Sequence, residues 1–256
     1  MYKTAIFVLI VITSMMFLLP YIYTVSPYKL DASNILLSPS WAHICGTDRL
    51  GRDIFARILQ GGQISLIIGF LSATISTFIG LMVGVSAGYF RFKTDKIIII
   101  VIDIFLTIPT FFLLLAIISY VDASIFVLVV VLSIASWMST ARLIRAGAYE
   151  VTHMPYIDIL NIAKTNKLKI LLKYYTPILA PIFLISWTFG VGGAILAESS
   201  LSFLGLGINP PQMSWGSLIS DGRAILDIAW WVSFYPGLFI FLVTFCLFVI
   251  SNRLQR

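Results

Sequence analysis

Long apolar stretches are the feature of this sequence that most restricts how the chain can fold. A helix needs about 20 apolar residues to cross the roughly 30 Å hydrocarbon layer of a membrane. Six segments reach or approach that length: residues 5–25, 64–90, 97–120, 124–139, 178–197 and 231–250. Apolar residues make up 59% of the 256 residues, a larger share than in ordinary globular domains. The sequence therefore predicts an all-α integral membrane protein with six transmembrane helices.

Basic residues predict the orientation of these helices. Six spans place both chain ends on one side, so the loops fall into two sets. One set carries twelve basic residues: Lys3, Arg91, Lys93, Lys96, Arg142, Arg145, Lys164, Lys167, Lys169, Lys173, Arg253 and Arg256. The other set carries five: Lys29, Arg49, Arg52, Arg57 and Arg223. Because positive charge marks the cytoplasmic side, we expect both termini in the cytoplasm. The net charge of +6 is spread over short loops, which favours a lipid bilayer over nucleic acid as partner.

The longest polar interval, residues 140–177, contains a predicted amphipathic helix over residues 155–163. A helical period places four of its apolar residues on one arc: Tyr156, Ile159, Leu160 and Ala163. Asp158 faces away from that arc. Such a helix either lies on lipid headgroups or docks onto another protein.

A carboxylate lies about two helical turns inside the third apolar segment. Inserting Asp103 in a membrane would cost about 2.5–3.5 kcal/mol unless it is paired. Arg142 and Arg145 are three residues apart on one helix face, within reach of it. The sequence predicts a buried ion pair from these three residues, with an ion pathway as the alternative.

Small residues recur at every fourth position of the second apolar segment: Ser72, Ser76, Gly80, Gly84 and Gly88. They predict a ridge on which another helix can approach closely. Ahead of this segment, residues 46–53 form a glycine-containing turn. We expect the helix that begins at Asp53 to lie on the membrane surface, with Ile54, Ile58 and Leu59 toward lipid and Arg57 reaching the headgroups.

Residues 198–216 are typical of a re-entrant turn. Gly205 and Gly207 permit a tight backbone, and we expect Trp215 in an aromatic girdle at the headgroups. Irregular backbone at this depth must be buried in protein or line a water-filled cavity. We therefore place six residues at the outer mouth of a pathway: Glu198, Ser202, Phe203, Gly205, Gly207 and Trp215. Glu198 alternatively caps backbone groups or pairs with Arg223.

These motifs resemble the permease subunits of binding-protein-dependent ATP-binding-cassette (ABC) importers for dipeptides, oligopeptides and nickel. The family pattern G-T-D-x-x-G-R-D matches residues 46–53, and E-A-S-L-S-F-L-G-L-G resembles residues 198–207. Residues 137–145 resemble W-x-x-x-A-R-x-x-R. Residues 140–177 lie where the family carries its E-A-A-x-x-x-G loop. There Asp158 keeps the acid, but Ile159, Leu160 and Lys164 replace the two alanines and the glycine.

The resemblance implies a type I ABC importer permease fold in a prokaryotic cell membrane. Residues 1–62 would form an anchor and outer segment, and residues 63–251 the transport domain with a coupling loop at 140–177. Implied partners are a homologous permease, two cytoplasmic ATPases and an extracytoplasmic solute-binding protein. The helix residues Tyr156, Asp158, Ile159, Leu160 and Ala163, with Lys164, would contact an ATPase.

The chain itself has no G-x-x-x-x-G-K-[ST] phosphate loop. ATP and Mg²⁺ are therefore expected on the ATPases, with neither an enzyme activity nor a cofactor on this chain. We also expect the loop to turn at Thr165-Asn166 rather than at Lys164, because Asn tolerates the left-handed conformation.

A peptide is the expected cargo by family frequency, and nickel or a metal chelate is the alternative. His43 and His153 are predicted on opposite sides of the membrane, and Cys45 and Cys246 in different layers, so no metal site is expected. An ion-coupled secondary transporter is the alternative from another class. It would have repeated halves and deep carboxylates, whereas this chain has no convincing repeat and only Asp103.

Overall fold

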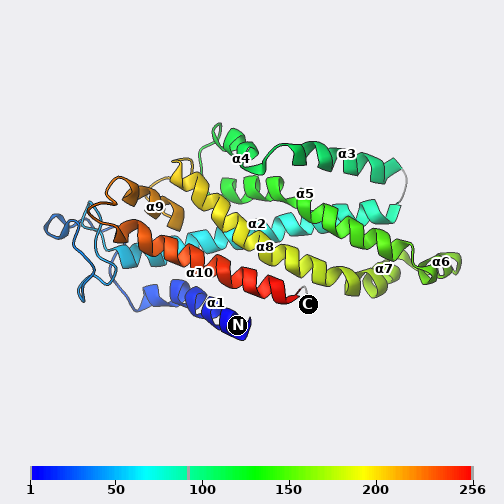
Figure 1. The fold of residues 1–256 in the computed structure, drawn as a ribbon, viewed down its shortest axis with the longest axis horizontal. Coiled ribbons are helices and arrows are strands. Elements are labelled where there is room, and N and C mark those ends of the chain that lie inside the picture. Colours follow the sequence, from blue (N-terminus) through cyan, green and yellow to red (C-terminus); the bar gives the residue numbers. More distant parts are fainter. Residues whose placement is uncertain (1, 91–92, 255–256) are drawn as a thin grey trace.

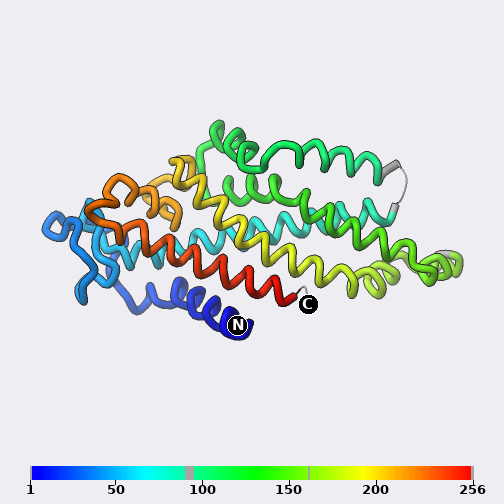
Figure 2. Tube along the Cα trace, in the orientation of Figure 1, coloured from blue at the N-terminus to red at the C-terminus, as the bar shows by residue number. Residues whose placement is uncertain are grey.

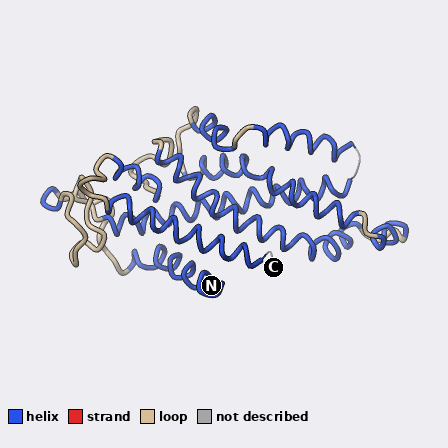
Figure 3. The backbone as a smooth tube through the Cα atoms, viewed as in Figure 1, coloured by secondary structure: helices blue, strands red, loops and turns tan. Residues whose placement is uncertain are grey.

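The computed structural model describes residues 2–90 and 93–254, and that part of the chain contains helices and no strands (Figure 1, Figure 3). The α-helices are α1 (Tyr2–Leu18), α2 (Ile54–Phe90), α3 (Lys93–Thr107), α4 (Thr110–Ile118), α5 (Ile125–Thr152), α6 (Pro155–Ile162), α7 (Lys167–Ile170), α8 (Thr176–Phe203), α9 (Trp215–Arg223) and α10 (Trp231–Leu254). A π-helical turn, Leu171–Tyr175, joins α7 to α8. Arg91 and Arg256, two of the basic residues counted above, lie outside the described residues.

Five continuous helical stretches are long and apolar enough to cross a membrane. They are 2–21, 54–89, 125–152, 167–203 and 231–254. The remaining span, third in chain order, is broken into α3 and α4, which meet at an angle of 80°. Pro109 causes the break, since it lacks an amide hydrogen and disfavours helical backbone at Ile108. The predicted all-α membrane fold is confirmed, with a bent third span.

Helix α2 is the central element, and it packs against α5 and α8 (Figure 1). A Cβ atom on Gly80 would lie 2.7 Å from Thr140, and one on Gly88 would lie 2.6 Å from Ala148. Glycine therefore allows the two helix backbones to approach closely. The predicted ridge of small residues is confirmed as the contact with α5.

The start of α2 differs from the prediction. The helix is continuous from Ile54, so the expected boundary at residue 62 falls inside it. Ile54, Ile58 and Arg57 are buried within the chain rather than lying on lipid. The expectation was wrong because the apolar side chains of α9 and α10 cover this turn of α2. At 37 residues, or about 55 Å, α2 is longer than the hydrocarbon layer is thick.

The two ends of the bundle differ in structure. One end, called here the α6 end, carries α6 and α7, and the other, the α9 end, carries α9 (Figure 1). Most of the long loops lie at the α9 end (Figure 3). The blue start of α1 and the red finish of α10 both point away from the α9 end (Figure 2).

The turn after α6 lies at Lys164 itself. Lys164 has φ +52°, and the Thr165 amide donates to the Leu160 carbonyl at 3.0 Å. This bond closes a Schellman motif, which requires left-handed backbone two residues after the last helical residue whatever the side chain there. The expected shift to Thr165-Asn166 is wrong. Asn166 instead caps α7 by accepting from the Leu168 amide at 2.9 Å.

Candidate functional site

A cavity of about 600 Å³ lies near the middle of the bundle, between α2, α4, α5 and α8. Seven of its lining residues carry a hydroxyl group: Ser76, Thr77, Thr110, Ser136, Ser139, Thr140 and Ser186. Gly190 and Gly193 form part of the α8 wall, and a Cβ atom on Gly193 would meet nothing within 4 Å. None of the described residues that line the cavity is charged. The cavity thus offers hydroxyl groups among apolar side chains, with no charge in its described lining.

The hydroxyl groups of the cavity lining differ in whether they already form hydrogen bonds. Ser76 and Ser139 donate to carbonyls of their own helices, each at 3.2 Å. The Oγ of Ser186 is buried and has no hydrogen-bond partner among the described residues. An unsatisfied hydroxyl inside a membrane protein is costly, so Ser186 favours a site where a polar solute or water completes its bonding.

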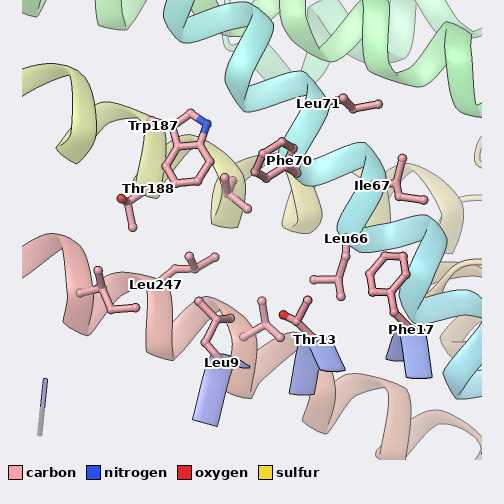
Figure 4. A pocket seen from close by; sticks show the side chains of 13 residues that line it. Leu9, Thr13, Phe17, Leu66, Ile67, Phe70, Leu71, Trp187, Thr188 and Leu247 are labelled. Atoms are coloured by element: carbon pink, nitrogen blue, oxygen red, sulfur yellow. The ribbon is translucent and has the colours of Figure 1, made fainter. Parts of the chain in front are cut away.

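A second cavity, of about 550 Å³, is almost entirely apolar (Figure 4). Leu9 and Phe17 of α1, Leu66 of α2 and Leu247 of α10 point into it, and Trp187 of α8 lies beside Phe70 (Figure 4). Such a lining suits lipid chains and not a hydrated solute. We therefore take the hydroxyl-lined cavity as the candidate site.

Sequence reasoning missed the hydroxyl-lined cavity. Its signal is the polar stripe of Ser136, Ser139 and Thr140 within an apolar segment, at the spacing of one helix face. That stripe does not reveal which helix lies opposite, because a polar face can meet a partner chain, a cavity or another helix.

The ionisable residues of α3 and α5 form two separate pairs. Arg142 donates to Asp103, but the two side chains are 56% and 51% exposed. Arg145 pairs with Asp95, with Nη2 to Oδ2 at 2.8 Å. The predicted pairing of Asp103 with an arginine of α5 is confirmed for Arg142, but its predicted burial is wrong, and Arg145 belongs to a different pair. Helix α3 packs on one side only, so the Asp103 pair faces outward.

Glu198 is completely buried at the junction of α8, α2 and α9. Ser202 Oγ donates to Glu198 Oε1 at 2.6 Å, and Ser65 Oγ donates to Oε2 at 3.3 Å. Ser65 also accepts from the Trp215 amide at 3.1 Å. The expected place of Glu198 at the outer mouth of a pathway is wrong, because its own chain covers this side chain. Arg223 does not pair with it and lies over the Phe203 ring instead.

The rest of the predicted outer mouth divides into buried and accessible parts. Trp215 is fully buried, and its Nε1 donates to the Ile58 carbonyl at 3.1 Å, so its expected place in a headgroup girdle is wrong. Ser214, just before α9, lies beside Ser202 of α8, with 3.3 Å between the two Oγ atoms. Gly205 and Gly207 line a polar hollow of about 330 Å³ with residues 119–123 at the α9 end. Phe203 remains partly exposed.

The turn at residues 46–53 is built around two aspartates. Asp48 accepts from the backbone amides of Leu50 and Arg52, and Asp53 caps α2 through the Ala56 amide at 2.8 Å. Tyr23 Oη donates to Asp53 at 3.1 Å. Burial, together with the negative charge of Asp53, raises the pKa of Tyr23 to about 12, so its phenol stays protonated.

An ionic clamp joins this turn to α9. Arg57 Nη2 lies 3.0 Å from Asp221 Oδ2, and its Nη1 lies 3.5 Å from Asp48 Oδ2. Arg49 donates to the Asp221 carbonyl at 3.1 Å. These residues are 164 or more positions apart from Asp221 in the chain, so the sequence pattern contained no signal for the contact.

Helix α6 presents part of its predicted apolar face. Ile159 and Ile162 are 65% and 81% exposed, and Tyr156 is also exposed. Leu160 packs partly into the core of the α6 end beside the buried Ile157. The exposed surface therefore centres on Ile159 and Ile162. Asp158, Ala163 and Lys164 are exposed at the same end.

A family model described as the inner membrane component of binding-protein-dependent transport systems matches residues 80–256. The chain belongs to this family. The oligopeptide transport system permease protein OppC of Mycobacterium bovis is 35% identical over 231 residues, or 90% of this chain and 78% of that protein. OppC of Haemophilus influenzae is 32% identical over 83% of this chain and 68% of that protein.

A solved structure of the MetNI methionine ABC transporter, in an inward-facing conformation, contains a similar chain. The TM-score is 0.62 at 18% identity, covering 79% of this permease and 98% of that chain. The type I ABC importer permease fold is therefore confirmed. As a membrane permease of this family, the protein is not itself an enzyme. Family membership also removes the alternative of an ion-coupled secondary transporter.

Proposed function

We propose that this permease forms one half of the translocation pathway of an ATP-driven importer for peptides, and that the cargo passes through the hydroxyl-lined cavity. The observation that carries the proposal is a cavity of about 600 Å³ with seven hydroxyl-bearing residues and no charge among its described lining. A hydroxyl group can donate a hydrogen bond to a peptide C=O group and can accept one from a peptide N–H group. A peptide is also the cargo named for its OppC relatives.

A homologous permease would close the other side of this pathway. Helix α3 leaves a row of large apolar side chains exposed, among them Ile100, Ile104 and Phe105. Near the bend, Phe111 and Phe112 of α4 are exposed as well. Such a contiguous apolar surface beside a polar cavity favours burial against a second membrane subunit.

The α6 end would face the cytoplasm and two ATPases, which would bind ATP and Mg²⁺. Its exposed Ile159 and Ile162 suit a helix that lies in a groove of a partner. Both termini would be cytoplasmic by the count of basic residues. A solute-binding protein would then dock at the α9 end, near Gly205 and Gly207.

Filling the cavity tests the pathway. Gly193→Phe places a ring where a Cβ meets open space, so the helix should fold while the passage is blocked. We expect ATP-dependent uptake of a labelled peptide by the reconstituted complex to fall by about tenfold or more. Gly193→Ala is the matched control and should transport normally. Wild-type uptake by an assembled Gly193→Phe complex would show that the cargo takes another route.

The cargo class is tested in the same vesicles. Unlabelled peptides should compete with the labelled peptide, whereas nickel or a nickel chelate should not. Competition by the chelate alone would support the metal alternative, while the cavity assignment would still depend on the Gly193 variants.

A further inference from the structure

A third groove, of about 610 Å³, runs along the contact between α2 and α8 at the α6 end. Its walls are apolar. Phe78, Met82 and Val85 contribute from α2, and Leu172, Leu179 and Phe183 from the opposite wall. Lys167 of α7 also lines it. A long apolar groove with a cationic residue in its wall matches neither a hydrated solute nor a plain hydrocarbon chain.

The charge around this groove has one sign. No acidic residue occurs between Asp53 and Asp95 or between Asp158 and Glu198, the intervals that supply both walls. Asp95 is already paired with Arg145. Two more lysines, Lys169 and Lys173, lie within six residues of Lys167. An anionic group at the Lys167 end therefore meets attraction that no nearby wall residue opposes.

The α7 segment places charge and apolar surface side by side. Leu168, Leu171 and Leu172 line the groove, and the π-helical turn begins at Leu171. Lys173 lies over the Tyr174 ring, 5.7 Å from its centroid. Lysines beside a leucine face are typical of helices that lie at the level of lipid headgroups. Basic pockets between transmembrane helices bind acidic lipid headgroups.

The groove lies along the same two helices as the apolar cavity, farther toward the α6 end. Phe183 is one helical turn from Trp187, which stands against Phe70 at the wall of the apolar cavity (Figure 4). Trp187 Nε1 donates to Thr74 at 3.0 Å, which holds α2 and α8 together between the two hollows. Both hollows thus lie along one α2–α8 seam.

We propose that this groove binds an anionic phospholipid, with its phosphate at Lys167 and an acyl chain along the wall toward Phe78 and Phe183. The apolar walls exclude a free phosphate ion as the full occupant, and Lys167 distinguishes the site from one for a neutral lipid. The bound lipid would fill the space between α2 and α8. The proposal depends on the membrane fold and not on the identity of the transported cargo.

Native mass spectrometry of the purified complex tests this site with phosphatidylglycerol and phosphatidylcholine of the same chain length. Wild type should bind phosphatidylglycerol more tightly. Lys167→Ala should weaken phosphatidylglycerol binding by about fivefold, the effect of one lysine near a lipid phosphate, and leave phosphatidylcholine unchanged. Ala180→Trp, which fills the groove, should weaken both lipids. Lys169→Ala is the matched control, since Lys169 does not line the groove, and it should weaken phosphatidylglycerol binding less than Lys167→Ala does.

Three results would overturn the site. They are equal binding of the two lipids by wild type, unchanged phosphatidylglycerol binding in Lys167→Ala, and equal weakening by Lys169→Ala. The last result would show general attraction to the basic loop. Loss of ATPase subunits from Lys167→Ala with phosphatidylglycerol binding intact would assign the lysine to a protein contact instead.

Discussion

At the scale of single residues, Glu198 joins three helices at one buried point. It belongs to α8, accepts from Ser65 of α2, and contacts the start of α9 through Ser202, whose Oγ lies 3.3 Å from Ser214 Oγ. Ser214 caps α9. The carboxyl group thus positions the re-entrant segment. This arrangement gives it a structural role that does not require contact with cargo.

Replacing Glu198 separates the structural role from a gating role. Glu198→Ala leaves buried hydroxyls without an acceptor and should lower stability by about 1–3 kcal/mol. Glu198→Gln keeps one acceptor oxygen and should lose less, while peptide uptake stays near wild type. Thermal unfolding of the detergent-purified protein and uptake into vesicles measure these effects. A Glu198→Gln variant that keeps its stability but loses uptake would mean that the charge itself is required.

At the scale of elements, the α6–α7 turn stores backbone strain at Lys164. Left-handed backbone is unfavourable for a residue with a side chain, and glycine relieves it. Lys164→Gly should therefore stabilise the C-terminal end of α6 by about 0.5–1 kcal/mol. Amide hydrogen exchange in α6 should slow by roughly two- to fivefold.

Lys169→Gly is the control for this prediction. Lys169 lies within α7, so glycine there should destabilise that helix and speed local exchange. Faster exchange of α6 in Lys164→Gly would show that the turn depends on a contact of the lysine side chain.

At the scale of the whole molecule, α6 is the element best placed to connect the bundle to a partner. Ile159→Asp puts a charge on its exposed apolar face without entering the core. If α6 occupies a groove on an ATPase, retention of that subunit should fall by about tenfold or more, because the carboxylate is buried unpaired. Co-purification from membranes measures this.

The control substitution lies at the opposite end of the bundle. Ile44 is an exposed isoleucine near the α9 end, and Ile44→Asp should leave ATPase retention unchanged. The Ile159 variant is also more selective than Leu160→Asp, since Leu160 packs into the core and its loss would disturb the fold. Full retention of the ATPase by Ile159→Asp would remove α6 as the contact.

Much of the fold follows from local rules. Helix positions, the bulk of each membrane span and the ridge formed by Gly80, Gly84 and Gly88 were predictable, because chain length, hydropathy and residue size act over short distances. The motif at residues 46–53 and the stretch 198–207 also identified the family correctly. Pro109 carried a signal for the bend in the third span, although its size depends on packing.

Tertiary structure decided which side chains are buried and which residues far apart in sequence contact each other. Ile54, Arg57 and Trp215 have patterns that suit lipid contact, yet they lie inside the chain because the starts of α2, α9 and α10 pack against one another. The free energy of an apolar side chain differs little between a protein interior and lipid, so hydropathy cannot distinguish these two environments. The hydroxyl-lined cavity, the Arg57–Asp221 clamp and the site of Glu198 depend on segments far apart in sequence. Only the packed helices bring those segments together.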